Sequence, residues 1–280
     1  MQTSIHHNTK AMTNETHYIY RTLIILILSI WPGVRLASQQ FNAEIEIIAN
    51  AGEYDFNVIP VASLGKIGAF VALGNKIIAL EDELDKNEIR SFSLPDSVNI
   101  EEFFFLNDRI VFKHRSNVIW STFEGHFDGM CFADDDFHIA SATDSTFLII
   151  HPAATSISEF SMANKDIITT YRFKELPLTA GMLGNSMVAI TEETLYLVNT
   201  KEAITLHQHP LPIKCAAITP MGIFFGTDSA LWRLIGVDEI EHIASGSINQ
   251  IFGSNRMLYV IDQIGNLYRF SYSENNDDTI

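Results

Sequence analysis

The sequence predicts an all-β protein of the β-propeller class. Three observations lead to this prediction. Hairpin-like phrases recur at a nearly constant interval, apolar and polar residues alternate within short runs, and no convincing helical period extends over about 12 residues of the mature chain. A composition with 47% hydrophobic residues also allows a sizeable core.

The recurring phrase is an apolar run, a polar turn and a second apolar run that carries an aromatic residue. β-branched and aromatic residues on both sides of turn residues are typical of a β-hairpin. The phrase is clearest at Met187–Val198, Ile223–Leu234 and Met257–Phe270. Its anchor leucines, Leu195, Leu231 and Leu267, are 36 residues apart in both steps, which indicates an internal repeat.

The second runs can be aligned along the whole chain. Their spacings are 41, 29, 48, 36 and 36 residues, with an average of 38, and the two irregular gaps are interpreted as one short and one long unit. Six units of about 40 residues with four short strands each predict a six-bladed β-propeller, with a stacked solenoid as the alternative. The aligned residues are Ile77, Val118, Phe147, Leu195, Leu231 and Leu267.

The segment Phe41–Ala49 alternates between apolar and polar residues, which predicts a half-buried strand outside the first unit. We expect it to pair beside Leu267–Tyr272 as the outer strand of the last blade, with Ile45 and Ile47 buried. Gly74-Asn75 fits a tight turn. Further strands are expected over residues 54–64, 69–73, 77–80, 89–94, 100–106, 109–113, 118–123, 130–132, 139–142, 147–150, 156–162 and 167–173.

The N-terminal residues have the pattern of a targeting signal. Thr22–Trp31 is almost wholly apolar but too short to span a membrane, and Lys10 and Arg21 supply a positive n-region. We expect cleavage after Ser38, with an uncleaved anchor as the alternative. The expected organisation is a signal peptide over residues 1–38, a propeller over 39–272 and a polar tail over 273–280.

Charge and cysteine content restrict the partners. The chain has 18 Lys and Arg against 34 Asp and Glu, a net charge of -16. An acidic surface repels nucleic acid and anionic lipid, so we expect neither nucleic-acid binding nor membrane binding after signal cleavage. Cys131 and Cys215 lie in apolar stretches and are expected to be free, buried thiols in inner strands of non-adjacent blades.

The phrases Phe225–Trp232 and Tyr259–Tyr268 resemble the hairpins of exported bacterial propellers, such as the PQQ-like, TolB-like and NHL-like repeat families. This resemblance implies a funnel-shaped central channel in which relatives bind ligands. The Gly-His and Trp-Asp pairing of WD40 repeats is absent from the sequence, and so is a sialidase-type Asp-box. The resemblance therefore implies architecture and transfers no functional residues.

Four groups of residues were considered for chemistry. His207 and His209 have the spacing of two metal ligands on one strand face, but no third ligand is near in sequence. The run from Asp134 to Asp136 lacks the alternation of a calcium loop and is interpreted as a solvated turn. Glu101 and Glu102 begin an inner strand, where a hydrolase would need a partner across the channel. The fourth group is Trp120, Tyr196, Trp232 and Tyr268, which is interpreted as packing between blades.

No catalytic, cofactor-binding or metal-binding residue is therefore predicted, and no cofactor. The sequence favours an exported, periplasmic or secreted, non-enzymatic propeller that binds a protein, surface or small-molecule ligand through its loops and channel mouth. Two alternatives are a metal-dependent hydrolase or lyase with its site in the channel, and a membrane-anchored envelope sensor if the segment Thr22–Trp31 is retained.

Overall fold

The computed structural model describes residues 43–50, 61–63, 69–73, 75–79, 91–93, 98–106, 109–123, 125–133, 136–143, 145–183, 186–199, 203–219, 221–253 and 257–272. The chain divides into two compact units, residues 1–39 and 40–280, and the description concerns the second unit. The expected signal peptide, the polar tail and most of the Gly74-Asn75 turn lie outside the described residues.

The described strands pair into six four-stranded sheets, which we number along the chain. Sheet 1 contains β2 (Val61–Ser63), β3 (Ala69–Leu73), β4 (Lys76–Ala79) and β5 (Ser91–Ser93). Sheet 2 contains β6 (Glu102–Phe105), β7 (Arg109–His114), β8 (Asn117–Thr122) and β9 (Phe127–Phe132). Sheet 3 contains β10 (His138–Ala142), β11 (Thr146–His151), β12 (Ser156–Ser161) and β13 (Asp166–Arg172).

The other three sheets follow in chain order. Sheet 4 contains β14 (Pro177–Leu183), β15 (Ser186–Thr191), β16 (Thr194–Val198) and β17 (Ala203–Gln208). Sheet 5 contains β18 (Cys215–Thr219), β19 (Gly222–Gly226), β20 (Ala230–Gly236) and β21 (Glu239–Ser245). Sheet 6 contains β22 (Ile248–Gly253), β23 (Met257–Asp262), β24 (Leu267–Tyr272) and, from the other end of the chain, β1 (Ala43–Ala49).

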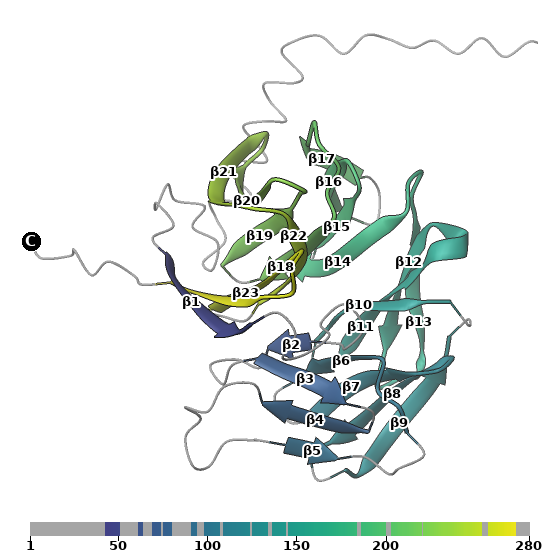
Figure 1. Ribbon diagram of the computed structural model, residues 1–280. Helices are drawn as coiled ribbons and strands as arrows, with labels where there is room; N and C mark the ends of the chain where they lie inside the picture. Colours follow the sequence, from purple (N-terminus) through teal and green to yellow (C-terminus); the bar gives the residue numbers. More distant parts are fainter. Residues whose placement is uncertain are drawn as a thin grey trace, which may run out of the picture. The chain divides into compact units, whose positions relative to one another are not determined.

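Within each sheet, strands adjacent in the chain pair in antiparallel fashion. The first strands of the sheets, β2, β6, β10, β14, β18 and β22, contact one another in this order, and β22 contacts β2 (Figure 1). The sheets therefore form a closed ring with their first strands innermost. This all-β architecture is that of a β-propeller, as the sequence predicted.

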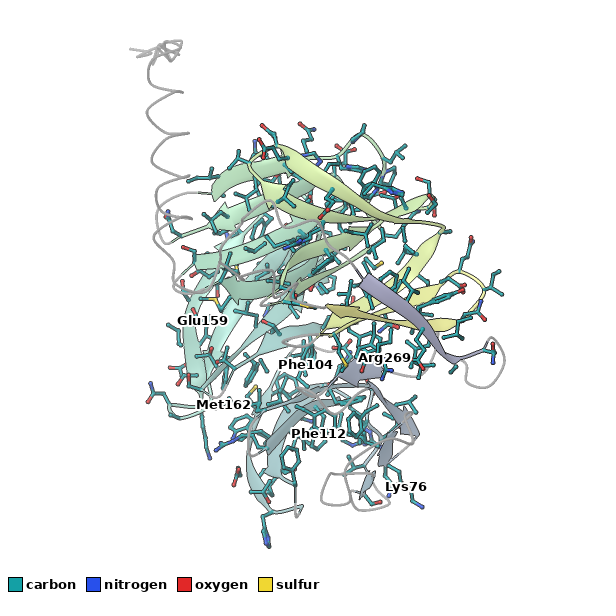
Figure 2. The ribbon with its side chains drawn as sticks, turned by 90° about the vertical axis from the view of Figure 1, so that its left-hand side faces the viewer. Lys76, Phe104, Phe112, Glu159, Met162 and Arg269 are labelled. Carbon is teal, nitrogen blue, oxygen red and sulfur yellow. The ribbon has the colours of Figure 1, made fainter. Side chains whose placement is uncertain are left out.

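The core consists of apolar clusters between neighbouring sheets. One cluster joins Phe70 and Ile77 of sheet 1 to Phe112 of sheet 2, which is labelled in Figure 2 and is 1% exposed. Corresponding clusters join the next pairs of sheets around the ring. In the last cluster, Tyr259 of sheet 6 packs with Val71 of sheet 1. Each sheet thus buries both of its faces, which suits the runs of Val, Ile, Leu and Phe in the middle strands.

The third strand of every sheet carries a fully buried aliphatic residue at its first or second position. The structure corrects the sequence alignment at one position, because Phe147 lies in β11, the second strand of sheet 3. The equivalent residue is Ile157 of β12. With this change the spacings become 41, 39, 38, 36 and 36 residues, so the repeat is regular and no short or long unit is needed. The six residues are Ile77, Val118, Ile157, Leu195, Leu231 and Leu267, each 0% exposed.

Strand β1 confirms the predicted closure of the ring by an N-terminal strand. It pairs in antiparallel fashion with β24, with Ile45 opposite Phe270 and Ile47 opposite Tyr268. Arg269, labelled in Figure 2, forms an ion pair with Glu46 across the same two strands. This pairing gives sheet 6 its fourth strand and connects two segments more than 200 residues apart.

The predicted burial of Ile45 and Ile47 is wrong, because these side chains are 53% and 54% exposed. β1 is the outermost strand of its sheet, and a register shift between Ile47 and Ala49 places Ala49 in the core instead. Ile48 packs against the same cluster.

Several hairpin turns are held by a side chain at the first turn position. The Thr191 hydroxyl accepts a hydrogen bond from Thr194 N at 3.1 Å, and the Thr227 hydroxyl accepts one from Ala230 N at 3.2 Å. In the last hairpin the Asp262 carboxylate accepts hydrogen bonds from Ile264 N, Gly265 N and Asn266 N. These side chains satisfy turn amides that the strand ladder leaves unpaired.

Candidate functional site

One end of the ring carries the residues that precede the innermost strands, and we call it the entry face. Because strands alternate in direction, the turns between second and third strands lie at the same end. Two contacts support this placement: Glu102 at the start of β6 bonds to the start of β10, and Ser247 before β22 accepts a hydrogen bond from Gln263 in the β23–β24 turn. β6 and β10 lie side by side in Figure 1.

Glu102 connects two innermost strands on the entry face. One of its carboxylate oxygens accepts a hydrogen bond from His138 Nδ1 at 2.6 Å, and the other accepts one from Ile139 N at 2.7 Å. Glu102 and His138 are 36 residues apart, which is one repeat. The carboxylate therefore bridges equivalent positions of neighbouring sheets.

The His138 ring is accessible to a ligand and holds its proton more strongly than an ordinary histidine. Its side chain is 56% exposed, and that of Glu102 is 26% exposed. The hydrogen bond to Glu102 raises the pKa of His138, although partial burial acts in the opposite direction. The pair therefore favours the charged imidazolium form of His138 on the entry face, compared with an ordinary histidine.

A buried lysine lies behind this pair. Lys113 Nζ donates a hydrogen bond to the Phe137 carbonyl at 2.7 Å and lies 3.5 Å from Glu101 Oε2. The ammonium group also lies 4.7 Å from the centre of the Phe137 ring. Glu101 in turn accepts a hydrogen bond from Arg115 N at 3.1 Å. Glu101 and Glu102 thus have separate partners on the entry face: Glu101 contacts Lys113 and Arg115 N, and Glu102 contacts the start of β10.

The rest of the entry face combines acidic and exposed apolar side chains. Leu176 and Leu178 at the start of β14 are 44% and 38% exposed, and Leu211 before β18 is 47% exposed. Ile264 in the β23–β24 turn is 77% exposed. The described carboxylates of this face are Glu101, Glu102, Asp136, Glu175, Glu192, Glu193, Asp228 and Asp262, and the described Lys and Arg residues are Lys76, Lys113, Arg115, Arg172, Lys174 and Lys214.

The other sequence candidates are placed as follows. His207 in β17 and His209 just after it lie against each other, with Nε2 and Nδ1 3.3 Å apart. Asp134 and Asp135 lie outside the described residues, and Asp136 is exposed. Among the residues that the structure describes, no group of three His, Cys, Asp or Glu side chains could hold a metal ion.

The aromatic residues pack between sheets, as the sequence predicted. Trp120 is 2% exposed and lies 5.9 Å from Phe147 of the next sheet, between ring centres. Tyr196, Trp232 and Tyr268 directly follow the buried leucines of their strands and pack against clusters between sheets. None of them forms a stacking platform on the entry face.

The cysteine prediction is partly wrong. Cys215 lies in the innermost strand β18, but Cys131 lies in β9, the outermost strand of sheet 2. Both are free. Burial raises the pKa of Cys131 to about 11 and that of Cys215 to about 12, so neither is a reactive thiolate at neutral pH.

Sequence reasoning missed His138 and Lys113 as partners of the two glutamates. One signal could have found His138, because it stands one repeat after Glu102. No spacing rule points to Lys113, whose ammonium is fixed by a carbonyl 24 positions away.

Comparison with known proteins identifies the architecture. No family model and no curated protein match the chain. Among solved structures, the WD40 β-propeller domain of Doa1 is 11% identical, with a TM-score of 0.56 over 83% of this chain and 98% of that chain. The RRP9 WD40 repeats are 10% identical, with a TM-score of 0.56 over 84% of this chain and 100% of that chain.

An enzyme also occurs among the similar structures. A catalytically inactive variant of virginiamycin B lyase from Staphylococcus aureus, solved with quinupristin, is 10% identical, with a TM-score of 0.54 over 82% of this chain and 100% of that chain. At such identities the likeness concerns the fold alone. The protein belongs to the β-propeller class, whose members include binding domains and enzymes. No helix in the described part of the chain is long and apolar enough to span a membrane.

Proposed function

We propose that this protein is an exported, non-enzymatic β-propeller that binds a protein or surface ligand through its entry face. In this proposal the six sheets are the blades of a six-bladed ring, and the loops at the channel mouth supply the contacts. The ligand is a protein rather than nucleic acid or membrane, because the net charge of -16 repels polyanions.

The observation that carries the proposal is the exposure of Leu176, Leu178 and Leu211 on adjacent sheets of one face. Apolar side chains surrounded by charged residues are typical of protein interaction sites. The connection that carries Leu211 is fixed by backbone hydrogen bonds, since Ile213 N donates to the Glu192 carbonyl and His209 N to the Glu193 carbonyl. Binding would therefore require little ordering of this segment.

The similar structures give independent support for a binding role. One is part of the mitotic checkpoint complex, and another is BBS1N in complex with ARL6DN. Both are propeller-like chains solved in assemblies with other proteins. The fold is accordingly suited to present loops to a protein partner.

Site-specific photo-crosslinking tests this function. A photoreactive residue at Leu178 or at Leu211 is expected to give the same discrete protein adduct, because both positions face the partner. The control position is Ala163, which is exposed in the turn between β12 and β13 at the opposite end of the ring. An adduct that forms equally well from Ala163, or no adduct from either leucine position, would contradict binding through the entry face.

Export is proposed from the pattern of the first 38 residues. Mass spectrometry of the protein recovered outside the cytoplasm is expected to give a mature N-terminus near Gln39. Recovery of the whole chain in the membrane fraction would instead favour the anchored sensor.

A second candidate function, acid–base catalysis in the channel, is favoured by the exposed His138–Glu102 pair. A charged imidazole with a raised pKa can donate a proton to a leaving group. The similar lyase structure is a histidine-to-alanine variant that lacks activity. The test is incubation with quinupristin, with and without Mg²⁺, followed by mass spectrometry. Conversion by the parent but not by a His138→Ala variant would establish this alternative.

A further inference from the structure

The buried pair of His207 and His209 is used by neither proposed function. The two residues are two positions apart, His207 in β17 and His209 just after it, and their facing nitrogens, His207 Nε2 and His209 Nδ1, are 3.3 Å apart. At this distance one nitrogen donates a hydrogen and the other accepts it. The contact therefore requires that at least one ring is neutral.

The pair forms part of the contact between sheet 4 and sheet 5. The His209 ring lies 5.1 Å from the Phe225 ring of β19 and 5.5 Å from the Trp232 ring of β20, between centres. His207 is 8% exposed and His209 5% exposed. Within the described part of the chain, the outer nitrogens His207 Nδ1 and His209 Nε2 are buried and have no hydrogen-bond partner. Nothing at hydrogen-bond distance would stabilise an added proton there.

Few charged groups of the packed elements face the pair. Asp238, in the turn between β20 and β21, has a carboxylate oxygen 3.9 Å from His207 Nδ1, but it is 57% exposed and therefore solvent-screened. His242 meets the Trp232 ring edge to face, with 5.2 Å between the ring centres. Arg233 follows Trp232 in β20, and Glu241 precedes His242 in β21, so both side chains lie on the opposite face of sheet 5. There they pair with each other at 3.6 Å.

Protonation is consequently unfavourable in the folded state. Burial lowers the pKa of both histidines; Asp238 partly opposes this for His207, and a charge on His207 lowers the pKa of His209 further. A histidine has a pKa of about 6.5 in the unfolded chain. Where folding lowers that pKa, the folded protein is fully stable above about pH 6.5. It loses stability as the pH falls from about 6.5 toward the lowered pKa of the folded state.

We propose that the His207–His209 pair is a pH-sensitive contact between sheets 4 and 5, which is complete when the rings are neutral and loosens when they are protonated. The protonated rings would bring two N–H groups together at 3.3 Å and place charge against Phe225 and Trp232. Separation of the rings requires movement of the β17 end away from sheet 5.

This movement would reach the entry face. His209 N bonds to the Glu193 carbonyl and begins the connection to β18, which carries Leu211. Acidification should therefore loosen the part of the entry face that displays Leu211. The effect on partner binding through Leu211 depends on the proposed function. The pH-sensitive contact between His207 and His209 does not.

The test is a titration of the whole protein with two readouts. In ¹⁵N-labelled wild-type protein, the ring signals of His207 and His209 are expected to titrate below the ordinary histidine range of about 6.5. Amide protection of Phe225 and Trp232 against hydrogen exchange is expected to fall from pH 7.5 to pH 5.5. The ring titration and the amide protection are both measured on the wild type, so they test the proposal even if a variant fails to fold.

A further measurement is the melting temperature as a function of pH. Between pH 7.5 and pH 5.5 the wild type is expected to lose roughly 3–8 °C relative to a His207→Gln, His209→Gln variant. His126→Gln, at an exposed position, serves as the matched control and should follow the wild type. Parallel curves for the wild type and the double variant, or ring titration at or above the ordinary range, would overturn the proposal. If the two rings titrate below the ordinary range as expected, but Leu178 gives no crosslink to a partner, the result would count against the proposed function alone.

Discussion

At the residue scale, the structure separates histidines with opposite behaviour. His138 is exposed and bonded to a carboxylate, so its charged form is favoured, whereas His207 and His209 are buried among aromatic rings, so their neutral forms are favoured. The pKa values of these histidines are therefore shifted in opposite directions, because the groups around them differ.

The first prediction concerns His138. Glu102→Gln keeps an acceptor for Ile139 N but removes the charge, so the pKa of His138 should fall toward its ordinary value. A histidine with a raised folded pKa contributes stability below about pH 6.5, and this contribution is lost as the pH rises through the raised value.

The variant should therefore lose about 0.2–1 kcal/mol of unfolding free energy at pH 6, after allowance for solvent screening, and less at pH 9. Ring NMR titration and denaturant unfolding at both pH values measure these effects. An unchanged His138 titration would show that Glu102 does not hold the imidazolium.

The second prediction concerns the thiols. Cys131 and Cys215 have raised pKa values near 11 and 12, so the thiolate fraction at pH 7.5 is very small. A thiol reagent should react slowly with the native protein and should titrate two thiols after unfolding without reductant. Recovery of no thiols in the unfolded, unreduced protein would indicate a disulfide and contradict the structure.

At the element scale, β1 acts mainly through its backbone. It covers the edge of β24, and its half-exposed Ile45 and Ile47 contribute less than full burial would. An uncovered β24 would present unpaired amides and carbonyls, which invite pairing with another chain. The strand thus closes the ring and protects its last sheet.

The third prediction follows from this role. A chain that begins at residue 50 should melt at a much lower temperature than one that begins at residue 39, and should aggregate more. Ile45→Asp with Ile47→Asp should cost only about 0.7–1.5 kcal/mol per residue, half of the roughly 1.5–3 kcal/mol for full burial, because the side chains are half exposed. Thermal melts of the three proteins provide the comparison. If the double substitution is as damaging as the deletion, the two side chains are buried in solution.

At the scale of the whole molecule, net charge determines which partners can approach. With 34 acidic and 18 basic residues, the protein carries a field that repels polyanions at long range. The fourth prediction is that the protein does not co-sediment with anionic vesicles or shift DNA at physiological salt. Binding that weakens as salt increases would reveal a basic surface that the composition conceals.

Much of the fold could be predicted from the sequence, because strand periodicity and hairpin turns are local. The hydrophobic pattern around Leu195, Leu231 and Leu267 predicted the repeat, and the alternation in Phe41–Ala49 predicted the strand that closes the ring, observed over Ala43–Ala49. The error at Phe147 has a physical cause. Second and third strands are both buried on two faces, so an apolar run in one has the same composition as a run in the other.

What only the tertiary structure decided is which side chains from different repeats meet. The sequence alone determined that Glu101 and Glu102 stand at the start of an inner strand and that His207 and His209 are two positions apart. The packing of neighbouring sheets placed His138 on Glu102 and Phe225 against His209. Such contacts depend on how two sheets meet face to face and join residues of different repeats, so no local sequence pattern predicts them.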